Sequence, residues 1–523
     1  MKKFKQIFIS SLFVLFLSSS CEDAYNIVQD GEINEESLTT LTDLKGYMNA
    51  GVYGSLSISN EIAFSAIFTD ETSIGRGNGG QGTDLHRFFL NSDDGYSYGI
   101  WYGSYQTINR VNRVLRIANR IGVPTNPADL ATYNSILGEA KAIRAFSYLR
   151  LLTYFSTDMK NDNATGVMFV GDAVAQASDS YPRVNNGVVF SAMEDDLAYA
   201  YANVNTTDYK YVTKSMINSL RARMYLYRGN YTLAKQYAED VIANSGVQLA
   251  LATPVPANAP VNGAPGSGAW NAAFYSANST NPYRKMWNDS ARGEIIFALD
   301  RPSAGAWENI AANFTTNTTS ASGSPLHEVS RNLFNNMTST SGDIRRYANV
   351  DPTSVLNPNY ANPGVDYIAT DVIVIDKYPG KSGFPLRNDV KVFRLSEIYF
   401  ILAECLAQEG NINGATNSVA QVIKKIRDAR NFLGPQPLPT YANATEAYAD
   451  ILLERRLELC FEGHRYIDIK RIGNLAGKQI ERDATDDEIP GPLTLSNNDY
   501  RYTMPIPRAE LNANNSLSQN PGY

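Results

Sequence analysis

Two glutamates near the C-terminus have the spacing of a catalytic pair. Glu458 and Glu462 lie one helical turn apart within residues 454–471 (ERRLELCFEGHRYIDIKR), so a helix would place both carboxyl groups on one face. A pair of carboxylic acids can act as the general acid and base that cleave a glycosidic bond. If this pattern is catalytic, the chemistry that it predicts is glycoside hydrolysis.

The same segment supports a structural interpretation, which we favour. Glycine 463 would end the helix, and the neighbouring cations would satisfy the two carboxylates as ion pairs. The apolar positions would form the buried face of that helix: Leu452, Leu453, Leu457, Cys460 and Phe461. We therefore expect Glu458 and Glu462 to stabilise the fold and the protein not to be an enzyme.

The remaining polar residues show no pattern of a metal, cofactor or phosphate site. The histidines His86, His327 and His464 are isolated, and the sequence has neither an HExxH motif nor a paired CxxC. The glycine-rich residues 76–80 (RGNGG) lack the preceding strand and following lysine of a phosphate-binding loop. We expect no cofactor and no metal.

Aromatic residues beside loops are the strongest chemical signal that is left. Flat rings stack on the C–H faces of sugars, and tyrosine can also hydrogen-bond to them. We expect Trp101 in the core, whereas residues 70–96 and 270–283 supply spare rings beside polar groups. The stacking candidates are Tyr96, Trp270, Tyr275 and Tyr283, and the candidate hydroxyl partners are Asp70, Arg76 and Asn91. A shared site requires the fold to bring these two segments together.

Composition excludes one class of partner. Among 523 residues, 53 acidic side chains outnumber 46 basic ones, for a formal net charge of −7. Nucleic-acid affinity depends on clustered Lys and Arg, so we expect no nucleic-acid partner.

The first residues have the pattern of an export signal. Lys2, Lys3 and Lys5 precede an apolar run at residues 7–17, which is shorter than a membrane span. Three serines then lead to Cys21, which looks like the acylated cysteine of a bacterial lipoprotein; cleavage without acylation is the alternative. We predict a signal peptide at 1–20, an acidic tether at 21–40 and a lipid anchor on Cys21.

The rest of the chain predicts one all-α domain at 41–523. Helical periodicity is strong in residues 100–120 and 135–155. Aligning Gly229-Asn230 with Gly410-Asn411, an offset of 181, suggests two related helical hairpins of tetratricopeptide type. We expect a helical-repeat part at 41–250, a loop-rich part at 251–390 with short strands near 294–298 and 371–375, and a C-terminal repeat part at 391–523. Stacked hairpins would form a curved scaffold, with Cys405 and Cys460 as buried free thiols.

These segments together resemble the SusD/RagB family of glycan-binding surface lipoproteins. The resemblance lies in Cys21 and in residues 101–112, 139–154, 394–411, 454–471 and 504–523, with Tyr466 where the family usually has tryptophan. It implies an all-helical, non-enzymatic protein at the outer membrane that serves as a lid over a SusC-like TonB-dependent transporter. The acidic pair Glu22-Asp23 resembles the family's surface-export signal.

The resemblance and the loop aromatics lead to one favoured function and two alternatives. We expect a binding protein that captures an oligosaccharide or polysaccharide at the cell surface and passes it to the transporter. The alternatives are a helical glycoside hydrolase that uses Glu458 and Glu462, and a transporter lid without glycan affinity of its own.

Overall fold

The structure is a computed structural model that describes residues 35–176, 178–253, 263–305, 307–315 and 325–523. Cys21 and the export signal lie outside the described residues. Parts of the loops near 260 and 320 do so as well. None of the described helices is both long enough and apolar enough to cross a membrane.

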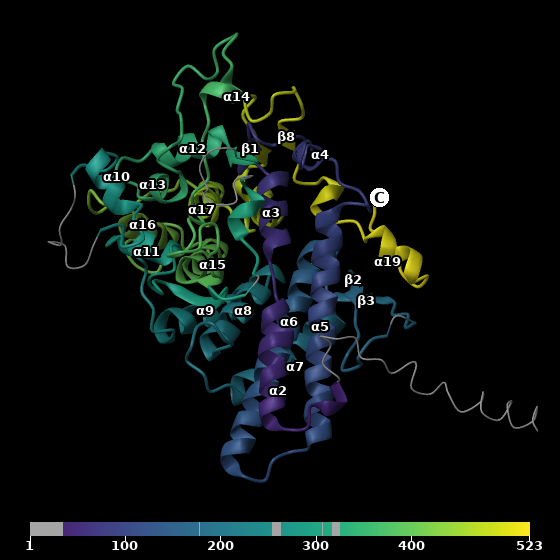
Figure 1. The fold of residues 1–523 in the computed structure, drawn as a ribbon. Coiled ribbons are helices and arrows are strands. Elements are labelled where there is room, and N and C mark those ends of the chain that lie inside the picture. The colour runs from purple at the N-terminus through teal and green to yellow at the C-terminus, as the bar shows by residue number, and fades with distance from the viewer. Residues whose placement is uncertain (1–34, 177, 254–262, 306, 316–324) are drawn as a thin grey trace, which may run out of the picture.

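Helices dominate the described chain, as expected (Figure 1). The helices before residue 250 are η2 (Glu35–Ser37), α2 (Leu41–Tyr47), η3 (Met48–Val52), η4 (Tyr53–Ser55), α3 (Ser59–Phe68), α4 (Thr83–His86), α5 (Gly95–Ile121), α6 (Pro127–Phe155), α7 (Asn186–Asn203), α8 (Lys214–Tyr227) and α9 (Tyr231–Asn244). Those of the middle part are α10 (Gly268–Phe274), α11 (Pro282–Trp287), η5 (Ile310–Asn313), α12 (Arg331–Thr338), α13 (Arg345–Asn349) and α14 (Tyr367–Thr370). The C-terminal ones are α15 (Leu395–Gln408), α16 (Val419–Arg430), α17 (Ala444–Leu459), α18 (Arg465–Ala476), η6 (Tyr500–Tyr502) and α19 (Arg508–Ala513).

The two longest helices confirm the predicted periodic segments. Asp94 caps α5 by accepting a hydrogen bond from the Ser97 amide, and Asn126 caps α6 just before Pro127, a residue suited to a first helical turn. The apolar face of α5 is buried against α6, which also packs on α7. Trp101 is fully buried in this layer, as expected.

The predicted repeat is real, but its second helices align differently. The turns after α8 and α15 contain Gly229 and Gly410, with φ angles of 74° and 79°, and each leads into a second helix. The helix α9 begins at Tyr231, whereas α16 begins only at Val419. The ungapped offset of 181 is therefore wrong beyond the turn. The loop before α16 is held by the Asn413 side chain, which both donates to and accepts from the backbone of Tyr441.

Short two-stranded antiparallel sheets fasten the loops to the helical scaffold. The strands are β1 (Thr72–Ile74) with β5 (His327–Val329), β2 (Thr165–Met168) with β3 (Arg183–Asn185), β4 (Ile295–Leu299) with β6 (Val390–Arg394), and β7 (Ile480–Glu481) with β8 (Thr494–Leu495). The strand expected near residue 295 is thus β4. Residues 371–375 form isolated bridges instead of a strand, among them Val372 with Val355 and Ile375 with Val350.

The tether that we expected at 21–40 ends earlier than residue 40. Glu35 forms ion pairs with Arg113 and Arg116 of α5, at 2.9 and 2.5 Å. Thr40 caps α2 in a reciprocal capping box with Asp43. These contacts attach the last residues of the predicted tether to the helical layer.

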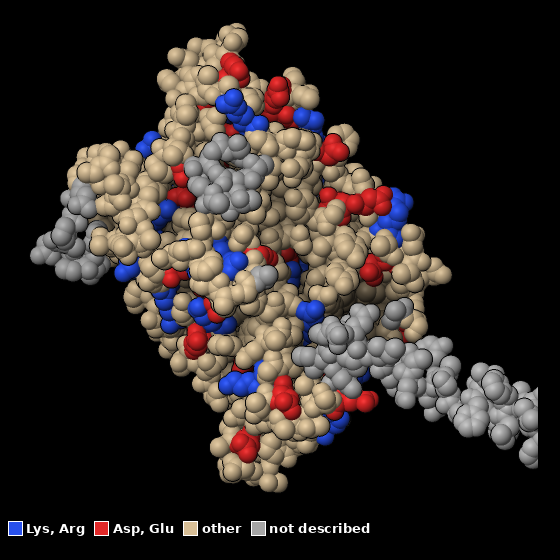
Figure 2. Space-filling view, viewed as in Figure 1, with Lys and Arg blue, Asp and Glu red and all other residues tan. Residues whose placement is uncertain are grey.

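Charged side chains of both signs are interspersed on the face shown in Figure 2. Cys405 and Cys460 are buried free thiols, as expected, and burial raises the pKa of the Cys460 thiol to about 12.

The turn geometry of the hairpins can be tested at Gly410. Gly410→Ala should lower the free energy of unfolding by about 1–2 kcal/mol, because its left-handed backbone disfavours a Cβ, and no atom lies within 4 Å of that Cβ to add a clash. Gly103→Ala, in the middle of α5 and equally open, should instead stabilise by about 0.5–1 kcal/mol. Urea denaturation measures both; a shift of the same sign in the two variants would contradict the assigned turn.

Candidate ligand-binding clefts

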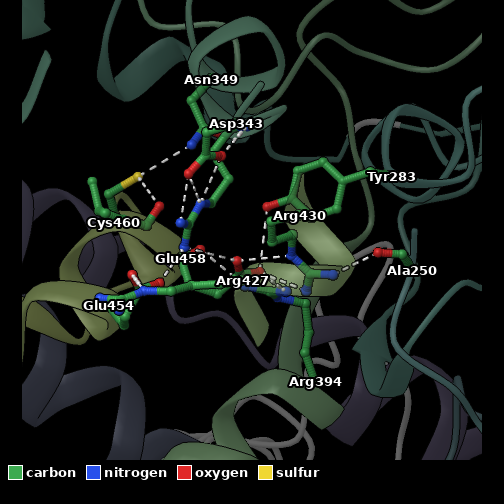
Figure 3. A network of polar contacts seen from close by, with 12 residues as sticks. Ala250, Tyr283, Asp343, Asn349, Arg394, Arg427, Arg430, Glu454, Glu458 and Cys460 are labelled. Atoms are coloured by element: carbon green, nitrogen blue, oxygen red, sulfur yellow. Dashed lines mark hydrogen bonds and ion pairs between the residues drawn. The ribbon is translucent and has the colours of Figure 1, made fainter. Parts of the chain in front are cut away.

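Glu458, the first residue of the pair considered for catalysis, lies inside a buried ionic network (Figure 3). Glu458 of α17 is fully buried. Its Oε1 accepts hydrogen bonds from Arg394 Nη1 and Arg430 Nη2, both at 2.9 Å, and its Oε2 accepts one from Arg430 Nε at 2.9 Å. Burial alone raises the pKa of Glu458, but Arg430 and Arg394 outweigh it and hold that pKa well below its ordinary value.

Glu462 belongs to the same network. Arg394 donates to both of its oxygens, at 2.7 and 2.8 Å, and Lys377 Nζ lies 2.7 Å from Oε1. Burial opposes ionisation here too, yet Arg394 and Lys377 lower the pKa of Glu462. Two buried and ionised carboxylates that share one arginine do not present an acid and a base to a glycosidic bond. The structure therefore supports their structural role.

Two of the predicted stacking residues are used in packing. Tyr283 of α11 is fully buried, and its hydroxyl lies 3.3 Å from Glu458 Oε1. Trp270 of α10 is only 8% exposed and stacks on Phe274 with ring centroids 4.4 Å apart. Neither ring has a free face for a sugar in this structure. Our placement of these two residues in a binding site is therefore corrected.

The other predicted residues divide between separate places. Asp70 is fully buried and forms a two-pronged ion pair with Arg465 of α18, at 2.7 and 2.8 Å, so it is not a free hydroxyl partner. Arg76 and Asn91 are exposed. Tyr96 lies at the start of α5, and Tyr275 follows α10. Figure 1 shows α10 and α4 on opposite sides of the molecule, so the fold does not unite the two predicted segments in one site.

Tyr96 lines the first of three clefts, which we call the Tyr96 cleft. It has a volume of about 450 Å³ and lies between the start of α3, the loop with α4, and the first turn of α5. Its polar lining residues are Asn60, Thr83, Asp84 and Asp94. Burial raises the pKa of the Asp94 carboxyl despite its hydrogen bond to the Ser97 amide. The cleft combines one aromatic wall with several hydrogen-bonding groups.

Tyr275 lines a second cleft of about 550 Å³, the Tyr275 cleft, beside the loop 379–385. Its floor holds a buried ion pair that we did not predict, with Arg284 Nη1 2.7 Å from Asp376 Oδ2. The hydroxyl of Tyr275 donates to the carbonyl of Tyr347 at 2.8 Å, which fixes the ring against α13. This cleft offers one aromatic side chain and a charged floor.

A third cleft, of about 620 Å³, lies between α12 and α17. We call it the Arg456 cleft, after an α17 residue in its floor. Asp70 lies beneath it. From the sequence we expect the cations near Glu458 and Glu462 to pair with those glutamates, whereas the structure pairs Arg456 and Arg465 with Asp70. The sequence signal that could have pointed to Arg456 and Arg465 is the dense charge of residues 454–471. Within the described residues, no group of three or more His, Cys, Asp or Glu side chains could hold a metal.

Comparison with known proteins gives consistent matches. The profile of the SusD family matches residues 374–523. SusD-like protein P2 of Formosa agariphila is 24% identical over 100% of both chains. A SusD superfamily structure from Bacteroides thetaiotaomicron aligns with a TM-score of 0.71 at 21% identity, covering 92% of this chain and 100% of its own. A laminarin-binding SusD-like protein aligns with a TM-score of 0.63 at 21% identity, covering 92% and 99%. These structures share the fold of this chain.

The structural role of Glu458 leads to a stability prediction. Glu458→Gln should lower the free energy of unfolding by about 3–5 kcal/mol, because Arg394 and Arg430 would keep buried charges without their shared partner. The matched control is Glu409→Gln, whose exposed pair with Lys235 spans 2.8 Å and should contribute less than about 1 kcal/mol. Chemical denaturation measures both variants. Unchanged stability of Glu458→Gln with lost glycan binding would assign Glu458 to the ligand instead.

Proposed function

We propose, from the premise that this chain belongs to the SusD/RagB family, that it binds an oligosaccharide or polysaccharide and delivers it to a TonB-dependent outer-membrane transporter. Glycan binding is supported by the laminarin-binding structural relative and by the clefts. Delivery to the transporter rests on the family resemblance. The protein acts by binding, without chemical conversion of the glycan.

The observation that carries this proposal is the Tyr96 cleft. An aromatic wall beside hydrogen-bonding side chains suits a sugar ring, which has apolar C–H faces and a polar edge. Arg76 extends from the loop that borders the cleft through Gly80 and Gly82. The exposed Arg76 guanidinium forms no ion pair or hydrogen bond with the described residues, so it is free to bridge adjacent hydroxyls.

Loops place these groups at the margin of a rigid scaffold. The Tyr96 ring packs partly against the core, and the Asp94 cap holds its helical turn. The loop before α4 is fixed by Asn78, whose side chain donates to the carbonyl oxygens of Gln81 and Leu326, at 2.7 and 2.9 Å. Such preorganisation lowers the entropy that binding must overcome.

Two assays distinguish the alternative functions from the proposed one. A glycoside hydrolase would release reducing sugars from a polysaccharide, although Glu458 and Glu462 are buried in ion pairs. A lid without affinity would leave every glycan unbound. A panel that includes laminarin, tested for both binding and reducing-sugar release, distinguishes the three functions.

Binding should depend on Tyr96. Tyr96→Ala should weaken affinity for the bound glycan by roughly tenfold or more, because a buried aromatic contact dominates such interfaces. The control is Tyr98→Ala, whose ring is 42% exposed and lies outside the cleft. Affinity electrophoresis and calorimetry measure binding, and thermal unfolding checks the fold. Equal affinities of wild type and Tyr96→Ala would place the site elsewhere, with the Tyr275 cleft next to test.

Membrane attachment should depend on Cys21. We propose that this residue, which lies outside the described part of the chain, carries the lipid. Cys21→Ala should move the protein from washed outer membranes to the soluble fraction without changing its thermal unfolding, because the anchor and the helical domain are separate. Retention of the variant in membranes of cells that lack the transporter would contradict lipid anchoring.

A further inference from the structure

The Arg456 cleft is the largest of the three clefts, and it is separate from the Tyr96 cleft. It lies between α12 and α17. Its floor consists of Asp70, Arg456 and Arg465, all of them more than nine-tenths buried. Three asparagines of α12 form one wall, and Glu481 of β7 with the preceding Lys478 and Gln479 forms part of the rim.

Two arginines in the floor share one carboxylate. Arg465 donates hydrogen bonds to both carboxylate oxygens of Asp70, at 2.7 and 2.8 Å. Arg456 Nη2 lies 3.5 Å from Asp70 Oδ2. Glu71, Asp468 and Asp486 also act electrostatically on one or both of these arginines, and burial raises the pKa of Glu71 to about 8 in spite of Arg465. Among the three residues that form the floor itself, two guanidinium groups therefore meet one carboxylate.

Of the two arginines in the floor, Arg456 is the one with a buried nitrogen that lacks a hydrogen-bond partner. Its Nη2 donates to the backbone carbonyl of Asp70, and its buried Nε has no hydrogen-bond partner among the described residues. A buried donor without an acceptor is unfavourable. A guanidinium binds a carboxylate or sulfate through parallel hydrogen bonds, so the floor is suited to an anionic group.

The rim is suited to hydroxyl groups. Its exposed residues carry both signs of charge, with Glu446 and Glu481 acidic and Lys478 basic. The side chain of Asn336 has no hydrogen-bond partner within the described chain and lines the wall. Amides donate hydrogen bonds to sugar hydroxyls and accept hydrogen bonds from them, and carboxylates accept them.

We propose that the Arg456 cleft binds a sugar unit that carries an anionic group, either the carboxylate of a uronic acid or a sulfate ester. The anionic group contacts Arg456 in the floor, and the hydroxyls contact the asparagines of α12 and the glutamates of the rim. The sugar nature of the ligand rests on the proposed function. The cleft gives the protein a means to recognise an acidic unit at a place distinct from the Tyr96 cleft.

Calorimetric titration of the mature full-length chain tests the proposal with four probes: glucuronic acid, glucose 6-sulfate, glucose and inorganic sulfate. At least one of the two acidic sugars should bind about tenfold or more tightly than glucose and inorganic sulfate. Preference for glucuronic acid or for glucose 6-sulfate assigns the source of the anionic group. Equal binding of glucose, or of inorganic sulfate, would overturn the proposal.

Variants locate the binding. Arg456→Gln should abolish the preference for the acidic sugar, and Asn336→Ala, at a partly exposed wall position, should weaken binding severalfold with unchanged thermal unfolding. The Asn336 variant carries the test if Arg456→Gln does not fold. Tyr96→Ala should leave binding of the acidic sugar unchanged. Unaltered affinity in Asn336→Ala and in any folded Arg456→Gln would overturn the assignment to this cleft.

The same data separate this inference from the proposed function. Binding of the acidic sugar with no binding of any glycan at the Tyr96 cleft would support the former and contradict the latter. Glycan binding that Tyr96→Ala abolishes, with no preference for acidic sugars, would give the opposite result.

Discussion

The sharing of buried arginines among buried glutamates is the interaction on which the C-terminal half depends. Arg394 ends β6, Arg430 ends α16 and Glu458 lies in α17, and Glu294 joins them from the residue before β4, with Arg394 and Arg430 at 2.7 and 2.8 Å. Each ion compensates the desolvation of the others, so removal of one leaves a charge that cannot reach water. The network consequently fixes the two-stranded sheet, a hairpin and α17 relative to one another.

This arrangement explains where ligand groups remain available. Tyr283 and Trp270 adjoin the ionic network and α13, and their rings complete the packing of the middle segment. Rings that stay accessible lie where loops meet the helical scaffold, as at Tyr96 and Tyr275. A rigid interior with binding groups at its loop margins lets specificity change without disturbing the fold.

Local pattern was sufficient for some features and insufficient for others. The periodicity of residues 100–120 and the turn glycines Gly229 and Gly410 predicted α5 and the hairpins, because these signals act over a few residues. Tyr283 is buried against Glu458, which lies 175 positions away in the sequence. A pattern of a few neighbouring residues cannot predict a contact between such distant positions. The contact of Arg456 with Asp70 likewise joins residues 386 positions apart, so the sequence suggested ion pairs there but not a cleft.

Contacts between segments far apart in the chain affect the order in which the protein folds. Asp70 meets Arg465 across 395 positions, and Ser97 Oγ donates to the Pro505 carbonyl across 408. Contacts of such range close late, because the entropy of a long loop must be overcome first. The layer of α5, α6 and α7 can assemble from neighbouring segments, whereas the floor of the Arg456 cleft is completed only after Arg465 has been synthesised. A chain that emerges N-terminus first thus forms its helical layer before the floor of this cleft.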